Sequence, residues 1–209
     1  MKLATTKAIE TRYSKHKFRS RLEARWAVFF DNLEIKWEYE KEGYDLQGEL
    51  YLPDFYIPSL DCWIEIKGEA PGVRSERLAE LLAKETGSPV YIFFGQIQQQ
   101  LDDQNFAAND SAYFYEEKSP DGSFDIRHKW TECSNCGRLE ILFDGRSDRM
   151  SCKESFQSAV WREQEKVAVP LDGKCPRSGE NFDKGYNSNS KRLLSAYGSA
   201  ISARFEWGE

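Results

Sequence analysis

Residues 51–57 read YLPDFYI and residues 63–68 read WIEIKG, and these two stretches decide which fold the chain is expected to adopt. Within sheets, proline is confined to strand starts, edges and bulges, so the first stretch predicts that Asp54 lies at a strand start. The second stretch is an apolar strand, in which successive side chains point to opposite faces. Glu65 and Lys67 therefore share one face, while Ile64 and Ile66 point to the other face and enter a core.

Asp54 and Glu65 are expected to lie side by side, and two neighbouring carboxylates repel each other. At about 4 Å and an effective dielectric constant near 20, the repulsion costs roughly 4 kcal/mol. A bound cation removes this cost, and Mg²⁺ favours such an oxygen site while it keeps some waters for chemistry. The pair of acids therefore predicts a magnesium site.

Hydrophobic periodicity predicts an α/β fold with a mixed central sheet. Apolar residues recur at spacings of three and four from Arg19 to Leu33, which predicts a helix. Three strands, a second helix and a fourth, fully apolar strand are expected to follow, and because one crossover helix comes after antiparallel hairpins the sheet should be mixed. The expected ranges are helices at 19–33 and 74–86 and strands at 35–39, 50–57, 62–67 and 89–94, with further strands at 112–118 and 139–143 and a last helix at 191–205.

The arrangement of Pro53-Asp54 and Glu65-Ile66-Lys67 resembles the active site of the PD-(D/E)XK nuclease superfamily, which has the restriction-endonuclease-like fold. A third match lies upstream in FRSRLEARW (residues 18–26), where Glu23 takes the place of a glutamate that many members carry on a first helix. The run from residue 18 to residue 68 is similar to small nucleases of bacteriophages and mobile elements. The resemblance implies a restriction-endonuclease-like αβββαβ core.

The resemblance also implies a metal-dependent endonuclease that hydrolyses phosphodiester bonds in DNA. Asp54 and Glu65 would hold Mg²⁺ or Mn²⁺ together with the carbonyl of Ile66. Lys67 would orient the attacking water, and Glu23 would complete the site through a water or a second metal ion.

Two other interpretations stay open. One is a catalytically silent DNA-binding or adaptor protein of the same fold, which the acidic overall charge and the large C-terminal half favour. The other is a nuclease that acts on RNA or on branched DNA, because members of one fold act on many substrates with the same site.

Charge is unevenly distributed along the chain. The formal net charge is −6, yet residues 1–25 contain eight lysines and arginines against two glutamates, a local charge of +6. Arg19, Arg21 and Arg25 flank Glu23 and are expected to contact DNA phosphates. A solvated basic tail is an equally good interpretation of residues 1–15.

The chain contains no apolar run of the roughly 20 residues that span a bilayer, and its first residues lack the apolar core of a signal peptide. We therefore expect no membrane partner and a cytoplasmic location in a bacterial or phage-infected cell. DNA is the expected partner, with a second copy of the chain as another.

Five cysteines in an intracellular chain indicate thiols or metal before disulfides. The stretch TECSNCGR (residues 131–138) is typical of a zinc knuckle, and later cysteines can close a tetrahedral structural site. His128 is an alternative ligand, and a redox pair or plain buried thiols is the competing interpretation. The predicted Zn²⁺ ligands are Cys133, Cys136, Cys152 and Cys175.

The change in pattern near residue 124 suggests two domains. Residues 1–123 are expected to form the nuclease domain, and residues 124–209 a zinc-binding, zinc-ribbon-like region with a C-terminal helix.

Overall fold

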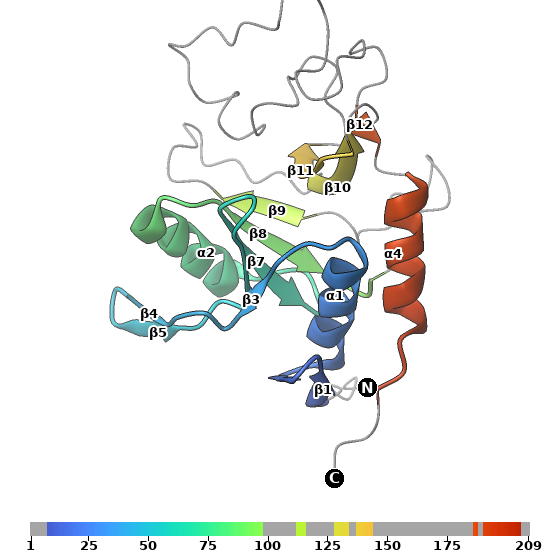
Figure 1. Cartoon of the computed structure of the whole chain (residues 1–209). Helices are drawn as coiled ribbons and strands as arrows, with labels where there is room; N and C mark the ends of the chain where they lie inside the picture. Colours follow the sequence, from blue (N-terminus) through green and yellow to red (C-terminus); the bar gives the residue numbers. More distant parts are fainter. Residues whose placement is uncertain are drawn as a thin grey trace, which may run out of the picture.

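A mixed sheet of eight strands lies at the centre of the molecule (Figure 1). The computed structural model describes residues 8–97, 112–115, 128–133, 137–143, 186–187 and 190–205. The strands of the central sheet are β3 (Glu38–Tyr39), β6 (Phe55–Ile57), β7 (Cys62–Lys67), β8 (Val90–Phe94), β9 (Ala112–Tyr115), β10 (His128–Cys133), β11 (Leu139–Phe143) and β12 (Tyr186–Asn187). They run in the order β11-β10-β9-β8-β7-β6-β3, with β12 paired to β10.

Helices cover both faces of this sheet (Figure 1). The helices of the described ranges are α1 (Arg21–Asn32), α2 (Val73–Thr86) and α4 (Lys191–Ser202). Strands β7 and β8 pair in parallel and α2 connects them, whereas the other pairs of the described sheet are antiparallel. The predicted mixed sheet is therefore confirmed.

Alternation along β7 divides the core into two layers. Ile64 and Ile66 belong to the cluster beneath α1, whereas Trp63 belongs to the cluster beneath α2. This is the pleat expected of a strand whose two faces are both covered. Glu65 points to the same side of the sheet as Trp63, because side chains two residues apart in a strand share a face.

The last helix packs against the first. Helices α1 and α4 lie side by side (Figure 1), and Leu193 and Tyr197 join Phe29 and Trp130 in one buried cluster. The boundary predicted near residue 123 falls outside the described residues. The described elements on either side of it nevertheless share one sheet and one hydrophobic cluster.

One side chain joins three distant segments at the end of α1. Arg192 donates from Nη2 to the carbonyl of Leu33 at 2.6 Å, which satisfies a carbonyl left without a partner at the helix end. Its Nη1 lies 3.2 Å from the carbonyl of Gly137 and 3.4 Å from Oε1 of Glu132. The C-terminal helix is thereby fixed to both α1 and the β10–β11 turn.

Two short hairpins were not predicted from the sequence. They are β1 (Thr11–Tyr13) with β2 (His16–Phe18), and β4 (Tyr44–Leu46) with β5 (Glu49–Tyr51). Each turns through two residues of positive φ: 46° and 69° at Ser14 and Lys15, and 59° and 87° at Gln47 and Gly48. Such turns match the twist of two-residue hairpins.

The single strand predicted over residues 50–57 is wrong. The chain forms β5 and β6 instead, which belong to different sheets and are separated by Leu52, Pro53 and Asp54. Proline fixes φ and removes the N–H that a continuous ladder requires. The strand predicted at 35–39 likewise shortens to β3, while the strand at 62–67 is observed over the predicted residues.

None of the helices in the described part of the chain is long and apolar enough to cross a membrane. The longest of these, α2, has 14 residues, whereas a bilayer requires about 20.

Candidate active site

Two buried carboxylates, Asp54 and Glu65, each accept a backbone N–H at the start of β6 and along β7. Asp54 directly precedes β6 and is 2% exposed, and its Oδ2 accepts the N–H of Ile66 at 2.8 Å. Glu65 on β7 is 1% exposed, and its Oε1 accepts the N–H of Asp54 at 3.2 Å. These two hydrogen bonds fix both side chains, so the structure brings together the two acids that the sequence singled out.

Lys67 lies at the rim of this pair. Its Nζ is 2.6 Å from Oε2 of Glu65, and its side chain is one-third exposed. The alternation of β7 places both residues on one face, as the sequence predicted. The site therefore has a buried acidic floor and a cation at its edge.

Glu23 holds the start of α1. Its Oε1 accepts the hydroxyl of Ser20 at 2.7 Å, and its Oε2 accepts the hydroxyl of Tyr39 at 2.6 Å and the N–H of Arg19 at 3.1 Å. In return, the N–H of Glu23 donates to Oγ of Ser20 at 3.1 Å. Ser20 is therefore the N-cap of α1, and Glu23 binds back to the Ser20 hydroxyl and to the N–H of Arg19, a variant of the capping box for which the Ser-x-x-Glu spacing of residues 20–23 is typical.

Arg19 reaches into the site itself. Its Nη2 forms an ion pair with Oδ1 of Asp54 and lies 3.4 Å from the carbonyl of Leu52. Its Nε is 2.9 Å from Oε1 of Glu40, a residue that the sequence analysis had not singled out. The arginine predicted to contact DNA thus neutralises a carboxylate in this structure.

Arg21 and Arg25 do not share this position. Both lie on α1 and are partly buried, and Nε of Arg25 is enclosed without a hydrogen-bond partner. Of the three arginines predicted to contact phosphates, only Arg19 is seen to contact the acidic pair.

Burial and mutual repulsion shape the protonation of the site. Burial raises the pKa of Asp54 well above its usual range, the charge of Glu65 raises it further, and Lys67 and Arg19 oppose both effects. Burial alone would lower the pKa of Lys67, but the charges of Glu65 and Asp54 raise it above its ordinary value. The site thus attracts additional positive charge.

Two tyrosines that sequence reasoning missed complete the surroundings. Burial raises the pKa of Tyr51, and the charge of Glu65 and a hydrogen bond to it raise the pKa further. Burial and the hydrogen bond to Glu23 raise the pKa of Tyr39. Both hydroxyls therefore remain protonated donors to carboxylates.

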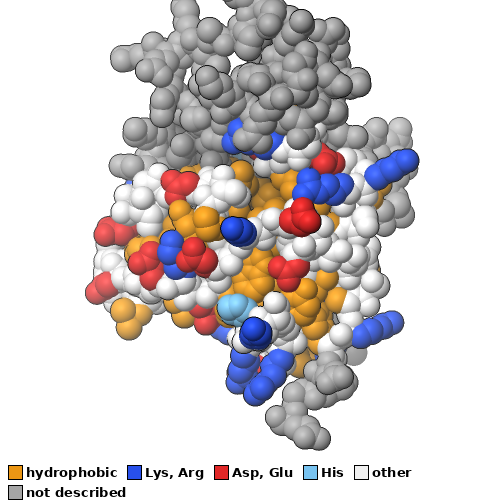
Figure 2. Space-filling view, viewed as in Figure 1, with side chains coloured by type: hydrophobic (Ala, Val, Ile, Leu, Met, Phe, Trp, Pro, Cys, Tyr) orange, Lys and Arg blue, Asp and Glu red, His pale blue; other side chains and the backbone are white. Residues whose placement is uncertain are grey.

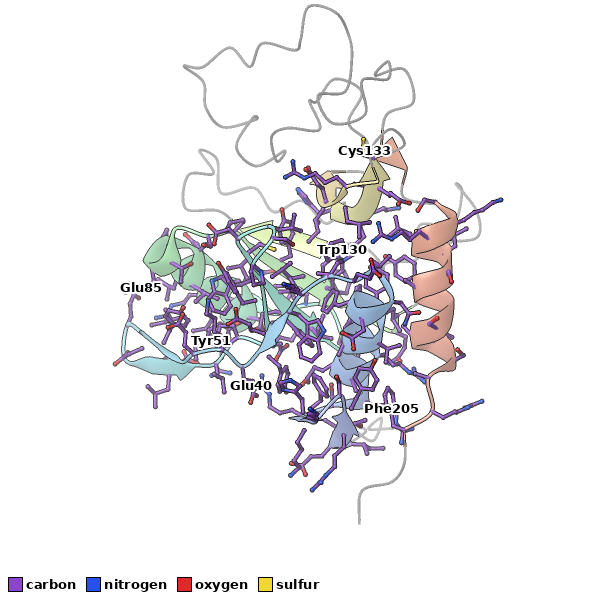
Figure 3. The ribbon with its side chains drawn as sticks, viewed as in Figure 1. Glu40, Tyr51, Glu85, Trp130, Cys133 and Phe205 are labelled. Carbon is purple, nitrogen blue, oxygen red and sulfur yellow. The ribbon has the colours of Figure 1, made fainter. Side chains whose placement is uncertain are left out.

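Figure 3 shows Tyr51 and Glu40 on the side of the molecule that carries β3, β4 and β5. Neither tyrosine carries a local sequence signal, because each meets its carboxylate partner only through long-range folding.

The donor set fits a hard divalent cation. Oδ1 of Asp54 and Oε2 of Glu65 bind no backbone N–H and face side-chain cations instead. In the described residues, no three His, Cys, Asp or Glu side chains converge as a metal-binding group. A pair of carboxylates matches Mg²⁺, which binds through one or two carboxylates and keeps water or phosphate oxygens at its other positions.

Comparison with known proteins gives no further guidance. No family model, no curated protein and no solved structure matches the chain. The site is therefore interpreted from its own chemistry.

The raised pKa of Asp54 predicts how stability depends on pH in the absence of metal. Between the unfolded pKa of about 3.9 and the higher folded pKa, the folded state binds more protons than the unfolded state. The contribution of Asp54 to the free energy of unfolding should therefore decrease as pH rises through this window. Asp54→Asn removes that contribution, and urea unfolding in EDTA at several pH values measures it. A stability difference between wild type and Asp54→Asn that is constant with pH would contradict the assignment.

The predicted zinc ligands lie mostly outside the described residues: Cys136, Cys152 and Cys175 are not described. Cys133 ends β10, its carbonyl accepts the N–H of Gly137 at 2.8 Å, and its N–H donates to the carbonyl of Arg138 at 2.8 Å. Gly137 has φ +70°, which favours glycine. These two hydrogen bonds bring Gly137 and Arg138 next to Cys133, and the zinc site stays a prediction.

His128 cannot share a zinc ion with Cys133. The two residues begin and end β10, and five residues of strand span about 16 Å. Two ligands of one zinc ion lie within roughly 4 Å of each other, given Zn–S and Zn–N bonds of about 2.3 and 2.1 Å. The alternative in which His128 replaces a cysteine beside Cys133 is therefore excluded. Figure 3 places Cys133 well away from Tyr51 and Glu40, so a zinc ion there would be structural.

Purified protein is expected to contain about one zinc ion per chain, and Cys133→Ser should remove it. The same change should lower the melting temperature, because metal-binding energy in such sites is folding energy. Elemental analysis and a thermal melt measure the two effects, with Cys62→Ser as the matched control because Cys62 lies in the core of β7. Wild-type protein that contains no zinc after purification without chelators would exclude the site.

Proposed function

We propose that the chain is a metal-dependent endonuclease of the PD-(D/E)XK type that hydrolyses phosphodiester bonds in DNA. The observation that carries this proposal is the buried pair of carboxylates, in which Glu65 accepts the N–H of Asp54, Asp54 accepts the N–H of Ile66, and Lys67 lies beside Glu65. A buried acid whose pKa is raised, as that of Asp54 is, next to a second buried acid and a cation is typical of catalytic sites. A folded protein gains little stability from two buried like charges, so a binding role for them is favoured.

The fold supports the same proposal. The elements α1, β3, β6, β7, α2 and β8 follow one another in the order helix, three strands, helix, strand, with two additional short hairpins. Asp54 directly precedes β6 and Glu65 lies on the neighbouring antiparallel strand β7, which also begins the parallel crossover to β8. This order of elements supports the restriction-endonuclease-like core that the sequence resemblance implied.

In this proposal each side chain has a distinct task. Asp54 and Glu65 hold Mg²⁺ or Mn²⁺, and the carbonyl of Ile66 is the third protein oxygen. The bound ion supplies Lewis acidity toward the phosphate and acidifies a water. Lys67 keeps a positive charge at the rim, where it orients the attacking water and stabilises the charge that develops on phosphate. Glu23 positions α1 and the backbone of Arg19 through its three hydrogen bonds.

The hairpin β1–β2 extends the expected DNA path. Arg12, Lys15 and Lys17 are exposed on it, directly before Arg19 in the chain. Figure 2 shows lysine and arginine side chains gathered at the lower end of the molecule, where Figure 1 places β1. Lys17 pairs with Glu10 at 2.6 Å, but both side chains are mostly exposed. Such a pair is worth about 0–1 kcal/mol and can give way to a phosphate.

A cleavage assay tests the proposal directly. Purified protein is incubated with closed circular, linear, nicked, branched and single-stranded DNA, and with RNA, in Mg²⁺, Mn²⁺ or EDTA. We expect closed circles to be nicked or linearised only when a divalent ion is present, because an endonuclease needs no end. Cleavage confined to RNA or to branched DNA would reassign the substrate, and no cleavage of any nucleic acid in either metal would count against the enzyme.

A catalytically silent nucleic-acid-binding protein is the second candidate. The observation in its favour is that the guanidinium of Arg19 forms an ion pair with Asp54 and so offers a cation to this carboxylate. This protein would bind DNA equally in EDTA and in Mg²⁺, and Mg²⁺ would not raise its melting temperature. For the enzyme, in contrast, Mg²⁺ should raise the melting temperature, because a ligand that binds the folded state stabilises it by mass action.

A further inference from the structure

The ion pair between Arg19 and Asp54 involves two very unequal environments. The carboxylate is 3% exposed, whereas the guanidinium side chain is 52% exposed. The backbone of Arg19 is held by Glu23 and Tyr39, so the residue cannot move away as a whole. Its side chain can rotate outward while its Cα stays in place.

The guanidinium of Arg19 donates to Oδ1 of Asp54, the oxygen with which a metal ion would be coordinated. Oδ2 of Asp54 is occupied by the N–H of Ile66, which leaves Oδ1 as the outward-facing ligand atom. Arg19 donates to that Oδ1, and a divalent ion at Asp54 would also be repelled by the fixed positive charge. Arg19 and a metal ion therefore exclude each other at this oxygen.

Glu40 gives the displaced guanidinium a second anchor. Nε of Arg19 is 2.9 Å from Oε1 of Glu40, and this carboxylate is nine times as exposed as that of Asp54 (27% against 3%). When Nη2 leaves Asp54, the contact through Nε can remain. The guanidinium then keeps free donors at the mouth of the site, and its fork geometry suits a phosphate.

We propose that Arg19 is the internal counterion of the metal-free site, which yields Asp54 to a divalent metal ion and then binds a phosphate group of the nucleic acid next to the scissile bond. This inference rests on the proposed function, because it takes a divalent ion and a phosphodiester as the two ligands. Arg19 first competes with the metal ion for Asp54, and it then contacts a phosphate of the substrate.

The test measures metal binding without nucleic acid. Mn²⁺ is titrated calorimetrically into metal-free wild type, Arg19→Gln and Arg19→Lys, with Arg74→Gln as a control. Arg74 pairs with Glu49 on the exposed surface, so its loss changes the net charge equally but outside the site. We expect Arg19→Gln to bind Mn²⁺ about tenfold more tightly, because a competing charged hydrogen bond is lost. Arg19→Lys should lie between the two, and Arg74→Gln should match wild type.

Cleavage at saturating Mn²⁺ supplies the second readout. Arg19→Gln should then cleave about tenfold or more slowly than wild type, since it lacks the phosphate contact. Tighter metal binding with slower cleavage supports the inference, and a merely structural role would weaken both. Equal Mn²⁺ affinity in wild type and Arg19→Gln overturns the inference and leaves the proposed nuclease standing. Absence of Mn²⁺ binding in both proteins overturns the inference and the proposed function together, whereas binding by Arg19→Gln alone supports the inference.

Discussion

Asp54→Asn is expected to reduce metal-dependent cleavage at least about a thousandfold, and Lys67→Ala about a hundredfold to a thousandfold, while both proteins stay folded. Asparagine retains an oxygen for the N–H of Ile66 but loses the charge that attracts a metal ion. Loss of Lys67 removes the partly exposed ammonium that is 2.6 Å from Glu65. Removal of one preorganised charge-stabilising group costs about 10²–10³ in rate, and removal of a metal ligand costs more.

Matched substitutions elsewhere separate chemistry from net charge. Asp45→Asn changes an exposed aspartate in β4, and Lys84→Ala changes an exposed lysine on α2. Both should cleave like wild type. Initial rates on closed circular DNA, together with circular dichroism spectra of every variant, make the comparison. Wild-type activity in well-folded Asp54→Asn would show that the metal site lies elsewhere.

Leu193→Ala is expected to lower the free energy of unfolding by about 2–5 kcal/mol, the range for a leucine removed from a packed core. Leu193 on α4 is fully buried in the cluster that contains Phe29 of α1 and Trp130 of β10. The cavity would therefore open between the first helix of the chain and its last helix. Because these elements share one core, urea unfolding should remain a single transition.

Ile201→Ala is the control for this prediction. It lies on the same helix with a side chain of similar size, but it is 39% exposed. We expect a loss below about 1 kcal/mol, in line with a surface position. If Leu193→Ala unfolds in two transitions, with the α1 region unaffected, then residues beyond 124 form an independent domain and the shared cluster is not cooperative.

Features that depend on local pattern were predictable. The apolar stripe of α1, the continuous apolar run of β8 and the alternation of β7 are each written in adjacent residues, and the structure has these elements within one or two residues of the expected ranges. The common face of Glu65 and Lys67 follows from the two-residue period of a strand alone. The neighbouring position of Asp54 then required only that β6 and β7 form a hairpin.

Features that depend on distant partners were not predictable. Arg19 lies 35 residues from Asp54 in the chain, and nothing local distinguishes an arginine that pairs with a buried acid from one that contacts phosphate. The β1–β2 and β4–β5 strands have only three residues each, too few for a periodic signal. The capping interaction of Ser20 with Glu23 is different, because its Ser-x-x-Glu spacing is visible in adjacent residues. The sequence analysis nevertheless interpreted Glu23 as a catalytic residue.

The contact of Arg192 with the end of α1 has a consequence for biosynthesis. The carbonyl of Leu33 accepts a hydrogen bond from Arg192, which is 159 residues further along the chain and is therefore synthesised later. At about 5–20 residues per second, translation of that interval takes roughly 8–32 s. Throughout this time the face of α1 that carries Phe29 has no α4 to cover it. A growing chain would therefore display an aromatic surface to chaperones, and ribosomes that stop early would release a product unable to close its core.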